Sequence, residues 1–174
     1  MSATKTQQTL SSALQAVVDK EEIRSVIYRF ARGSDRGIRD LVQSVFHPDA
    51  TDNHGFYNGP AKDMYDALNA GPSPDAAHHH IGQSLIELGD DGITAAAETY
   101  CIATTVNVVD GKDKWVTFLV RYIDTFEKRE GEWKIKDRVL AFDGVSDGNV
   151  LKSLPKESLG RRDENDYSRK VMKN

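Results

Sequence analysis

The stretch that decides the fold reads Ala76-Ala77-His78-His79-His80-Ile81-Gly82-Gln83, three consecutive histidines that lead into the alternating run Ser84–Leu88. This pattern predicts a strand that begins with the histidines, and side chains on a strand point alternately to its two faces. His78 and His80 are therefore expected on one face and His79 on the other. If the sheet curves around a cavity, at least one imidazole stands inside it, where a histidine can gain or lose a proton near neutral pH.

Strand-like segments continue after the histidines. They cover about 79–88, 93–106, 114–127 and 132–143, and turns rich in glycine and in acidic residues separate them. Long strands joined by tight turns predict an antiparallel meander. The chain before residue 70 has helical character, so helices followed by a meander predict an α+β layer arrangement.

The first third of the chain predicts the helices. Apolar residues repeat with helical spacing from Leu10 to Val18 and again from Ile23 to Ser34, and Gly33 and Gly37 mark the end of this stripe. A short helix over 38–46, a short strand pair over 50–60 and a third helix over 60–70 follow. Asp35 is expected at the inner edge of the first helix end, where a carboxylate is costly unless a partner binds it.

Length and composition limit the classes of protein that this chain can represent. With 174 residues we expect a disordered N-terminus over 1–9, one domain over 10–145 and a C-terminal tail over 146–174. A net charge of −4 argues against a nucleic-acid binder with a basic face, and a single cysteine excludes internal disulfides. No apolar run suits a membrane span or a signal peptide, so we expect a soluble cytoplasmic protein.

Several motifs occur together in a characteristic order and at characteristic spacings. They are Tyr28–Gly37, Phe46–Ala50, His54-Gly55, Gly59-Pro60, His79–Gly82, Tyr122–Glu127 and Gly131–Trp133. With these motifs the sequence is similar to the SnoaL-like branch of the nuclear-transport-factor-2 superfamily, which includes scytalone dehydratase, hexachlorocyclohexane dehydrochlorinase and bile-acid 7α-dehydratase. The resemblance covers about residues 10–145 and implies a cystatin-like α+β barrel, with helices packed on a strongly curved mixed or antiparallel sheet around a pocket.

The resemblance also implies a catalytic pair. In this family an aspartate at the end of the first long helix pairs with a histidine at the start of a strand, and these positions correspond to Asp35 and His80. His79, on the opposite face, is expected to have a structural or inter-subunit role. Phe30 stands where some members carry a polar helper. The expected substrate pocket comprises Tyr28, Phe30, His54, Tyr57, His78, Tyr100, Tyr122 and Phe142.

Simpler interpretations of the same residues stay open at this stage. Asp35 can cap the helix that follows it, and His80 can be a structural histidine bonded to a backbone carbonyl. His78 and His80 share the spacing of a cupin-like metal pair, but no histidine follows His80 to complete such a site. We therefore expect no metal and no cofactor.

The leading functional hypothesis is a cofactor-independent lyase or isomerase of the dehydratase, dehydrohalogenase or ketosteroid-isomerase type. It would remove a proton from a small apolar organic substrate by means of His80 and Asp35, with no nucleic-acid or membrane partner. The alternative is a non-catalytic ligand-binding or assembly module, such as the small subunit of ring-hydroxylating dioxygenases. The resemblance also implies a homodimer or homotrimer.

Overall fold

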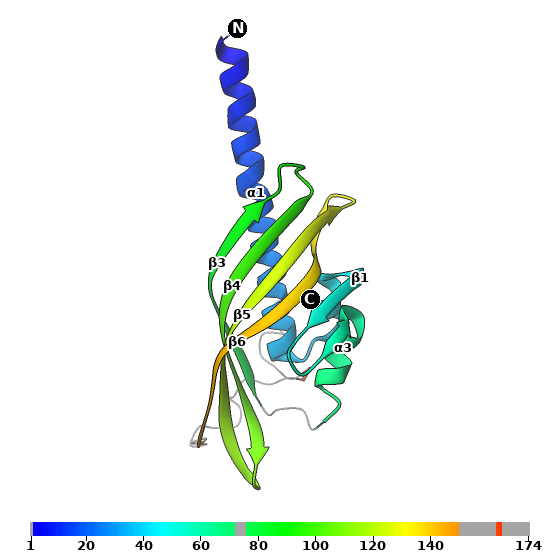
Figure 1. The fold of residues 1–174 in the computed structure, drawn as a ribbon, viewed down its shortest axis with the longest axis vertical. Helices are drawn as coiled ribbons and strands as arrows, with labels where there is room; N and C mark the ends of the chain where they lie inside the picture. Colours follow the sequence, from blue (N-terminus) through cyan, green and yellow to red (C-terminus); the bar gives the residue numbers. More distant parts are fainter. Residues whose placement is uncertain (1, 72–75, 150–162, 165–174) are drawn as a thin grey trace.

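The computed structural model describes residues 2–71, 76–149 and 163–164. Three helices and six strands form the fold (Figure 1), and the order of elements follows the predicted order closely. The elements are α1 (Ser2–Arg36), α2 (Arg39–Ser44), β1 (Phe46–Asn53), β2 (Asn58–Pro60), α3 (Ala61–Leu68), β3 (Ala77–Leu88), β4 (Thr94–Val109), β5 (Lys112–Arg129) and β6 (Glu132–Asn149).

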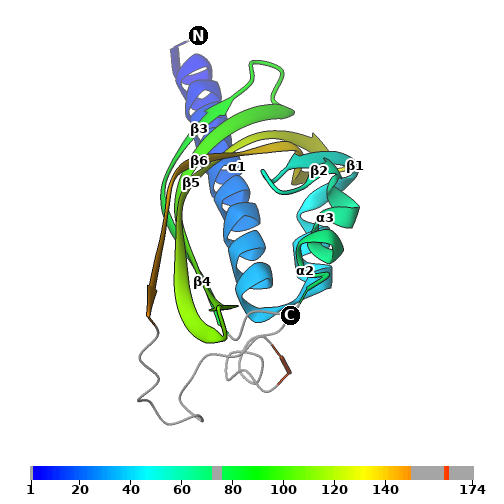
Figure 2. The ribbon, with the colours of Figure 1, turned by 60° about the horizontal axis from the view of Figure 1, so that its bottom comes forward.

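The six strands form one sheet in the order β2-β1-β6-β5-β4-β3. The four long strands pair as the predicted antiparallel meander, while β1 pairs parallel to β6, so the sheet is mixed. Figure 2 shows the sheet curving around α1, with α2 and α3 beside its open side. The predicted α+β fold, with helices packed on a strongly curved mixed sheet, is confirmed.

Helix α1 provides the inner wall of the fold. Its residues Ile23, Val26, Ile27 and Phe30 are at most 2% exposed and pack in the hydrophobic core. The helical spacing of these residues is the reason that α1 buries one stripe against the sheet. The structure makes one continuous helix from Ser2, where the sequence predicted disorder up to residue 9, and its N-terminal turns extend beyond the sheet (Figure 1).

Polar contacts fix α1 to the far end of the sheet. Asp19 accepts hydrogen bonds from Lys128 Nζ at 2.7 Å and from Trp133 Nε1 at 2.9 Å. Burial opposes the charge on Asp19, but these donors outweigh it and lower the pKa of the carboxyl. Trp133 itself is buried in the core, at 3% exposed.

The turn from α1 to α2 depends on two glycines. A Cβ on Gly33 would lie 2.8 Å from the side chain of Val42, so only glycine lets the two helices approach this closely. Gly37 has a positive φ of 61°, and α1 ends at Arg36, directly before it. Asp35 is therefore held in the last turn of α1, as the sequence predicted.

The ends of the sheet differ from the predictions by a few residues. β6 continues to Asn149, into the segment predicted as a tail, and the remainder of that tail lies largely outside the described residues. Within the part of the chain that the structure describes, no helix is long and apolar enough to cross a membrane.

Candidate active site

A cavity of about 400 Å³ lies between α1, α3 and the inner face of the sheet. Phe30, Met64, Phe118, Val120 and Leu140 are among the residues that make its wall mainly apolar. Two histidines, His54 and His79, contribute polar groups to this wall, and so does the phenol of Tyr122. An apolar chamber with a few convergent polar groups is the usual form of a small-molecule site.

The carboxylate of Asp35 holds the ring and the backbone of His79. Nδ1 of His79 lies 2.5 Å from Oδ1 of Asp35, and the backbone N–H of His79 donates to Oδ2 at 3.0 Å. Because an ionised carboxylate only accepts hydrogen bonds, Nδ1 carries the proton and Nε2 is the ring nitrogen left for a ligand. Burial raises the pKa of Asp35, but the bonds from His79 outweigh it and hold that pKa below its ordinary value.

The predicted partner of Asp35, His80, was therefore the wrong histidine. His78 and His80 both point to the other face of β3, where they are exposed and their rings stack 6.4 Å apart. The prediction rested on the resemblance, which was matched to the wrong one of two adjacent histidines. The pairing of β3 with β4 shifts between Ile81 and Ser84, so unbroken alternation along the strand does not give the correct face either. Before the shift, Ala77 and His79 face the cavity.

The predicted pocket residues divide into two groups. Phe30, His54, Tyr122 and Phe142 line the cavity as predicted. Tyr28, Tyr57, His78 and Tyr100 do not belong to its lining. Tyr28 is 50% exposed on α1, and the Tyr57 hydroxyl turns away to donate to the backbone oxygen of Pro60.

The prediction that Tyr100 lines the pocket was wrong because of the strand face on which it lies. It lies on β4 next to Cys101, which is buried on the inner side, so alternation places Tyr100 on the outer face. There its ring lies 6.0 Å from the guanidinium carbon of Arg121 and is 43% exposed.

A second imidazole enters the cavity from the end of β1. Nδ1 of His54 lies 3.1 Å from Oδ1 of Asp52, whose carboxylate is completely buried. The turn that follows is tight: Gly55 has a φ of 72°, and a Cβ there would lie 2.3 Å from the ring of Phe142. This turn therefore fixes His54 in place. The sequence predicted His54 as a pocket residue but did not indicate Asp52 as its partner, although only one residue separates the two.

A buried ion pair beneath the cavity was also not anticipated. Arg138 on β6 donates to both oxygens of Asp124 on β5, at 2.7 and 2.8 Å, and neither side chain is exposed. Its guanidinium carbon lies 4.1 Å from the ring centre of Phe30 and 4.2 Å from that of Tyr122. A cation between two aromatic faces is attracted by both rings. The only signal in the sequence was a pair of opposite charges on neighbouring predicted strands.

Burial has opposite effects on the two members of this pair. It raises the pKa of Asp124, whereas for Arg138 it is outweighed by the Asp124 carboxylate, which raises the pKa of the guanidinium. We take the pair as ionised, because two short parallel hydrogen bonds match a guanidinium to a carboxylate.

Two further acidic groups near the cavity stay protonated at neutral pH. Burial raises the pKa of Tyr122 well above its ordinary value, and it raises that of the Cys101 thiol to about 11. The Tyr122 side chain is hydrogen-bonded to that thiol. Tyr122 is thus a neutral phenol in the cavity wall, and Cys101 is an unreactive thiol.

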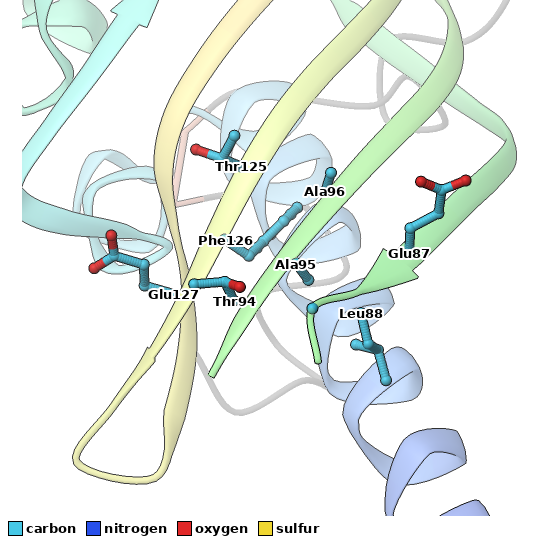
Figure 3. Close-up of a pocket in the computed structure, with 9 residues that line it drawn as sticks. Glu87, Leu88, Thr94, Ala95, Ala96, Thr125, Phe126 and Glu127 are labelled. Carbon is cyan, nitrogen blue, oxygen red and sulfur yellow. The ribbon is translucent and has the colours of Figure 1, made fainter. Parts of the chain in front are cut away.

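A second hollow, of about 440 Å³, lies over the ends of β3, β4 and β5 (Figure 3). Its described lining consists of small residues, Leu88 and Phe126, and the acidic residues Glu87 and Glu127, without a histidine. The described residues also contain no group of three or more histidine, cysteine or acidic side chains that could hold a metal ion. Of these two hollows, the one that holds His79 and His54 is therefore the one with imidazoles in its wall.

Comparison with known proteins identifies the family. Residues 15–139 match the family described as the SnoaL-like domain. The chain belongs to this family. The match covers α1 from its middle turns, most of the cavity lining and the sheet into the first half of β6. No curated protein matches the sequence.

Solved structures share the fold at low sequence identity. The chain is similar to a type 2 hexachlorocyclohexane dehydrochlorinase, at 17% identity and a TM-score of 0.70, over 83% of this chain and 98% of that one. A candidate scytalone dehydratase from Novosphingobium aromaticivorans gives 19% identity and a TM-score of 0.68, over 83% and 97% of the two chains. A protein from Kribbella flavida gives 20% identity and a TM-score of 0.66, over 75% and 95%. The nuclear-transport-factor-2-like fold implied by the resemblance is thus confirmed.

Proposed function

We propose that this protein is a cofactor-independent lyase or isomerase in which His79, held by Asp35, removes a proton from carbon in a small apolar substrate. The observation that carries the proposal is the contact of 2.5 Å between Asp35 Oδ1 and His79 Nδ1 at the wall of an apolar cavity. In a neutral imidazole whose Nδ1–H donates a hydrogen bond to a carboxylate, Nε2 carries a free lone pair. This lone pair faces the cavity, as a general base requires.

The surroundings of the pair suit proton transfer. Both side chains are largely buried, at 13% and 11% exposed, so the base is shielded from bulk water while one ring edge faces the cavity. Asp35 stabilises the imidazolium that forms when His79 takes a proton, and its second oxygen holds the backbone of the same residue. The base is therefore oriented before a substrate arrives.

The apolar wall limits the substrates that fit. A cavity of about 400 Å³ suits a compound of one or two rings, and Phe30 and Phe118 offer it aromatic contacts. Relatives of the same fold are described as a dehydrochlorinase and a candidate dehydratase, and both reactions begin with the removal of a proton from carbon. This common first step supports the proposal without identifying the leaving group.

The base can be tested apart from any leaving group by deuterium exchange. Propiophenone has a phenyl ring and acidic hydrogens beside its carbonyl, and NMR in D₂O follows their replacement by deuterium. We expect the protein to accelerate this exchange and His79→Gln to reduce the acceleration by about 10²–10⁴-fold, which is the usual contribution of a general base.

The same strand offers a matched control. His80→Gln changes an exposed imidazole one residue away, and we expect it to exchange as fast as the wild type. Equal rates for wild type and His79→Gln would overturn the proposal. A loss in His80→Gln instead would restore the partner that the sequence predicted.

A further inference from the structure

The cavity holds two aspartate–histidine pairs, and only one of them is needed to remove a proton. His79 approaches from β3 and His54 from the end of β1, and their ring centres lie 6.5 and 6.2 Å from that of Phe30. The two imidazoles thus flank the same aromatic ring at the cavity wall. Both imidazoles also line the same cavity, so one bound compound can contact both.

The buried charges around the two histidines differ. Near His79 the Asp35 carboxylate lies close to the Arg36 guanidinium, so one negative and one positive charge balance while the ring is neutral. Near His54 lie two buried carboxylates, Asp52 and Asp124, and a single guanidinium, Arg138. A proton on His54 brings this second group to a formal charge of zero.

The Asp52 carboxylate supports the same assignment. It is completely buried, and among the described residues its Oδ2 has no hydrogen-bond partner, while Oδ1 faces Nδ1 of His54. A buried carboxylate is costly unless a charge is paired with it, and the single neighbouring guanidinium, which also attracts Asp52, makes its two hydrogen bonds to Asp124. An imidazolium at His54 supplies that charge. The other titratable groups nearby, Tyr57 and Tyr122, are phenols with raised pKa values and contribute none.

From this arrangement we infer that His54, oriented by Asp52, is a general acid that protonates an oxygen leaving group, so that the protein is a dehydratase rather than a dehydrohalogenase. This inference rests on the proposed function, because it assigns a second proton transfer to the same cavity. The substrate class is a small cyclic or aromatic compound with a hydroxyl group on the carbon next to an acidic C–H.

The reaction balances without any other reagent. His79 Nε2 takes the proton from carbon, and the electron pair of the C–H bond forms the double bond. The C–O bond breaks, its electron pair goes to oxygen, and His54 Nε2 delivers the proton that turns the departing hydroxide into water. The two histidines have then exchanged protonation states, and solvent restores both after product release. A halide needs no such proton, which is why a general acid favours hydroxyl over halide as the leaving group.

A matched pair of probes separates the two histidines. β-Hydroxypropiophenone and β-chloropropiophenone both eliminate to phenyl vinyl ketone, which is followed by its ultraviolet absorbance. We expect His54→Gln to slow loss of water by about 10²–10⁴-fold more than it slows loss of chloride or deuterium exchange of propiophenone. His79→Gln should slow all three reactions, and His80→Gln none.

The outcomes distinguish the two proposals. If His79→Gln slows all three reactions while His54→Gln slows none, or slows loss of water and of chloride equally, the base stands and the general acid is overturned. If the wild type exchanges and eliminates none of the probes, the proposed function is overturned.

A measurement without turnover tests the acid directly. In the full chain labelled with ¹⁵N-histidine, the five histidines are assigned by single substitutions, and ¹⁵N shifts report which ring nitrogens carry protons. We expect His54 protonated on both nitrogens at the assay pH, His79 on Nδ1 only, and loss of the Nε2 proton of His54 in Asp52→Asn. A His54 with a bare Nε2 in the wild type would overturn the inference.

Discussion

The inner and outer faces of the same two strands use arginine in opposite ways. Arg138 on β6 points inward, where it and Asp124 are completely buried between aromatic rings. Arg121 on β5 points outward and binds Glu98 and Asp143 at 2.6 and 2.9 Å, with all three side chains 31–42% exposed. Similar pairing geometry therefore occurs in two environments, and the environment decides what each pair contributes.

The same contrast exists on β3 between neighbouring histidines. His79 faces inward onto Asp35, while His78 and His80 stack on the outer face in contact with solvent. Residue type alone does not separate these three side chains. The side of the sheet on which each lies assigns one of them to the cavity and leaves two outside it.

The largest expected effect comes from breaking the inner pair. Arg138→Met leaves the Asp124 carboxylate buried without a partner, and we expect a loss of about 3–5 kcal/mol in the free energy of unfolding, measured by urea denaturation. The double variant Arg138→Met, Asp124→Leu removes both charges and should recover most of this loss. A single variant as stable as the wild type would show that Asp124 is not buried as an ion.

A smaller effect is expected at the pair that joins α1 to β3. Asp35→Asn keeps the shape of the side chain but removes the charge that binds the ring and backbone of His79. We expect a loss of about 1–3 kcal/mol in the free energy of unfolding near pH 7, since a buried group loses a charge-assisted hydrogen bond.

The pH dependence of this loss has a definite sign. The pKa of Asp35 is lower in the folded protein than its ordinary value of 3.8. Its charge therefore stabilises the fold fully above about pH 4, and this contribution is lost as the pH falls through the folded pKa. The difference between wild type and Asp35→Asn should shrink as the pH falls below 3.8. A difference that grows below this pH would contradict the assignment.

The sequence predicted the helices and strands of the fold better than it predicted which side chains pair with each other. Helical spacing and turn residues are local signals, so α1, α3 and the four-stranded meander could be found from them. The partner of Asp35 could not be found in this way, because it depends on a shift in strand register between Ile81 and Ser84. Local spacing and turn residues do not predict that shift. If side chains alternated without a break from the buried Ile86 back to the histidines, His80 would share the inner face with Ile86. This would again select the residue next to the correct histidine.

The two pairs that the sequence missed show the same limit. Asp52 lies near the end of β1 and His54 directly follows that strand, so a search for carboxylates beside each predicted pocket histidine would have found this pair. Arg138 and Asp124 are 14 residues apart on facing strands, and their pairing follows from the register of β5 and β6. Only the curved sheet reveals that this pair lies beneath Phe30.

The smallest expected effect is at the outer arginine, and it tests the comparison most directly. Arg121→Gln removes the contacts with Glu98, Asp143 and the ring of Tyr100, all of them on the outer face. Water and salt screen charges that remain partly exposed, so we expect the urea midpoint to stay within experimental error of the wild type at 0.15 M salt. A loss comparable with that of Arg138→Met would contradict this, because it requires Arg121 to be withdrawn from water. Repeating the measurement over a range of protein concentrations then decides the cause: a midpoint that rises with concentration means that a second copy covers the outer face, whereas a constant midpoint means that the outer network itself stabilises the strands.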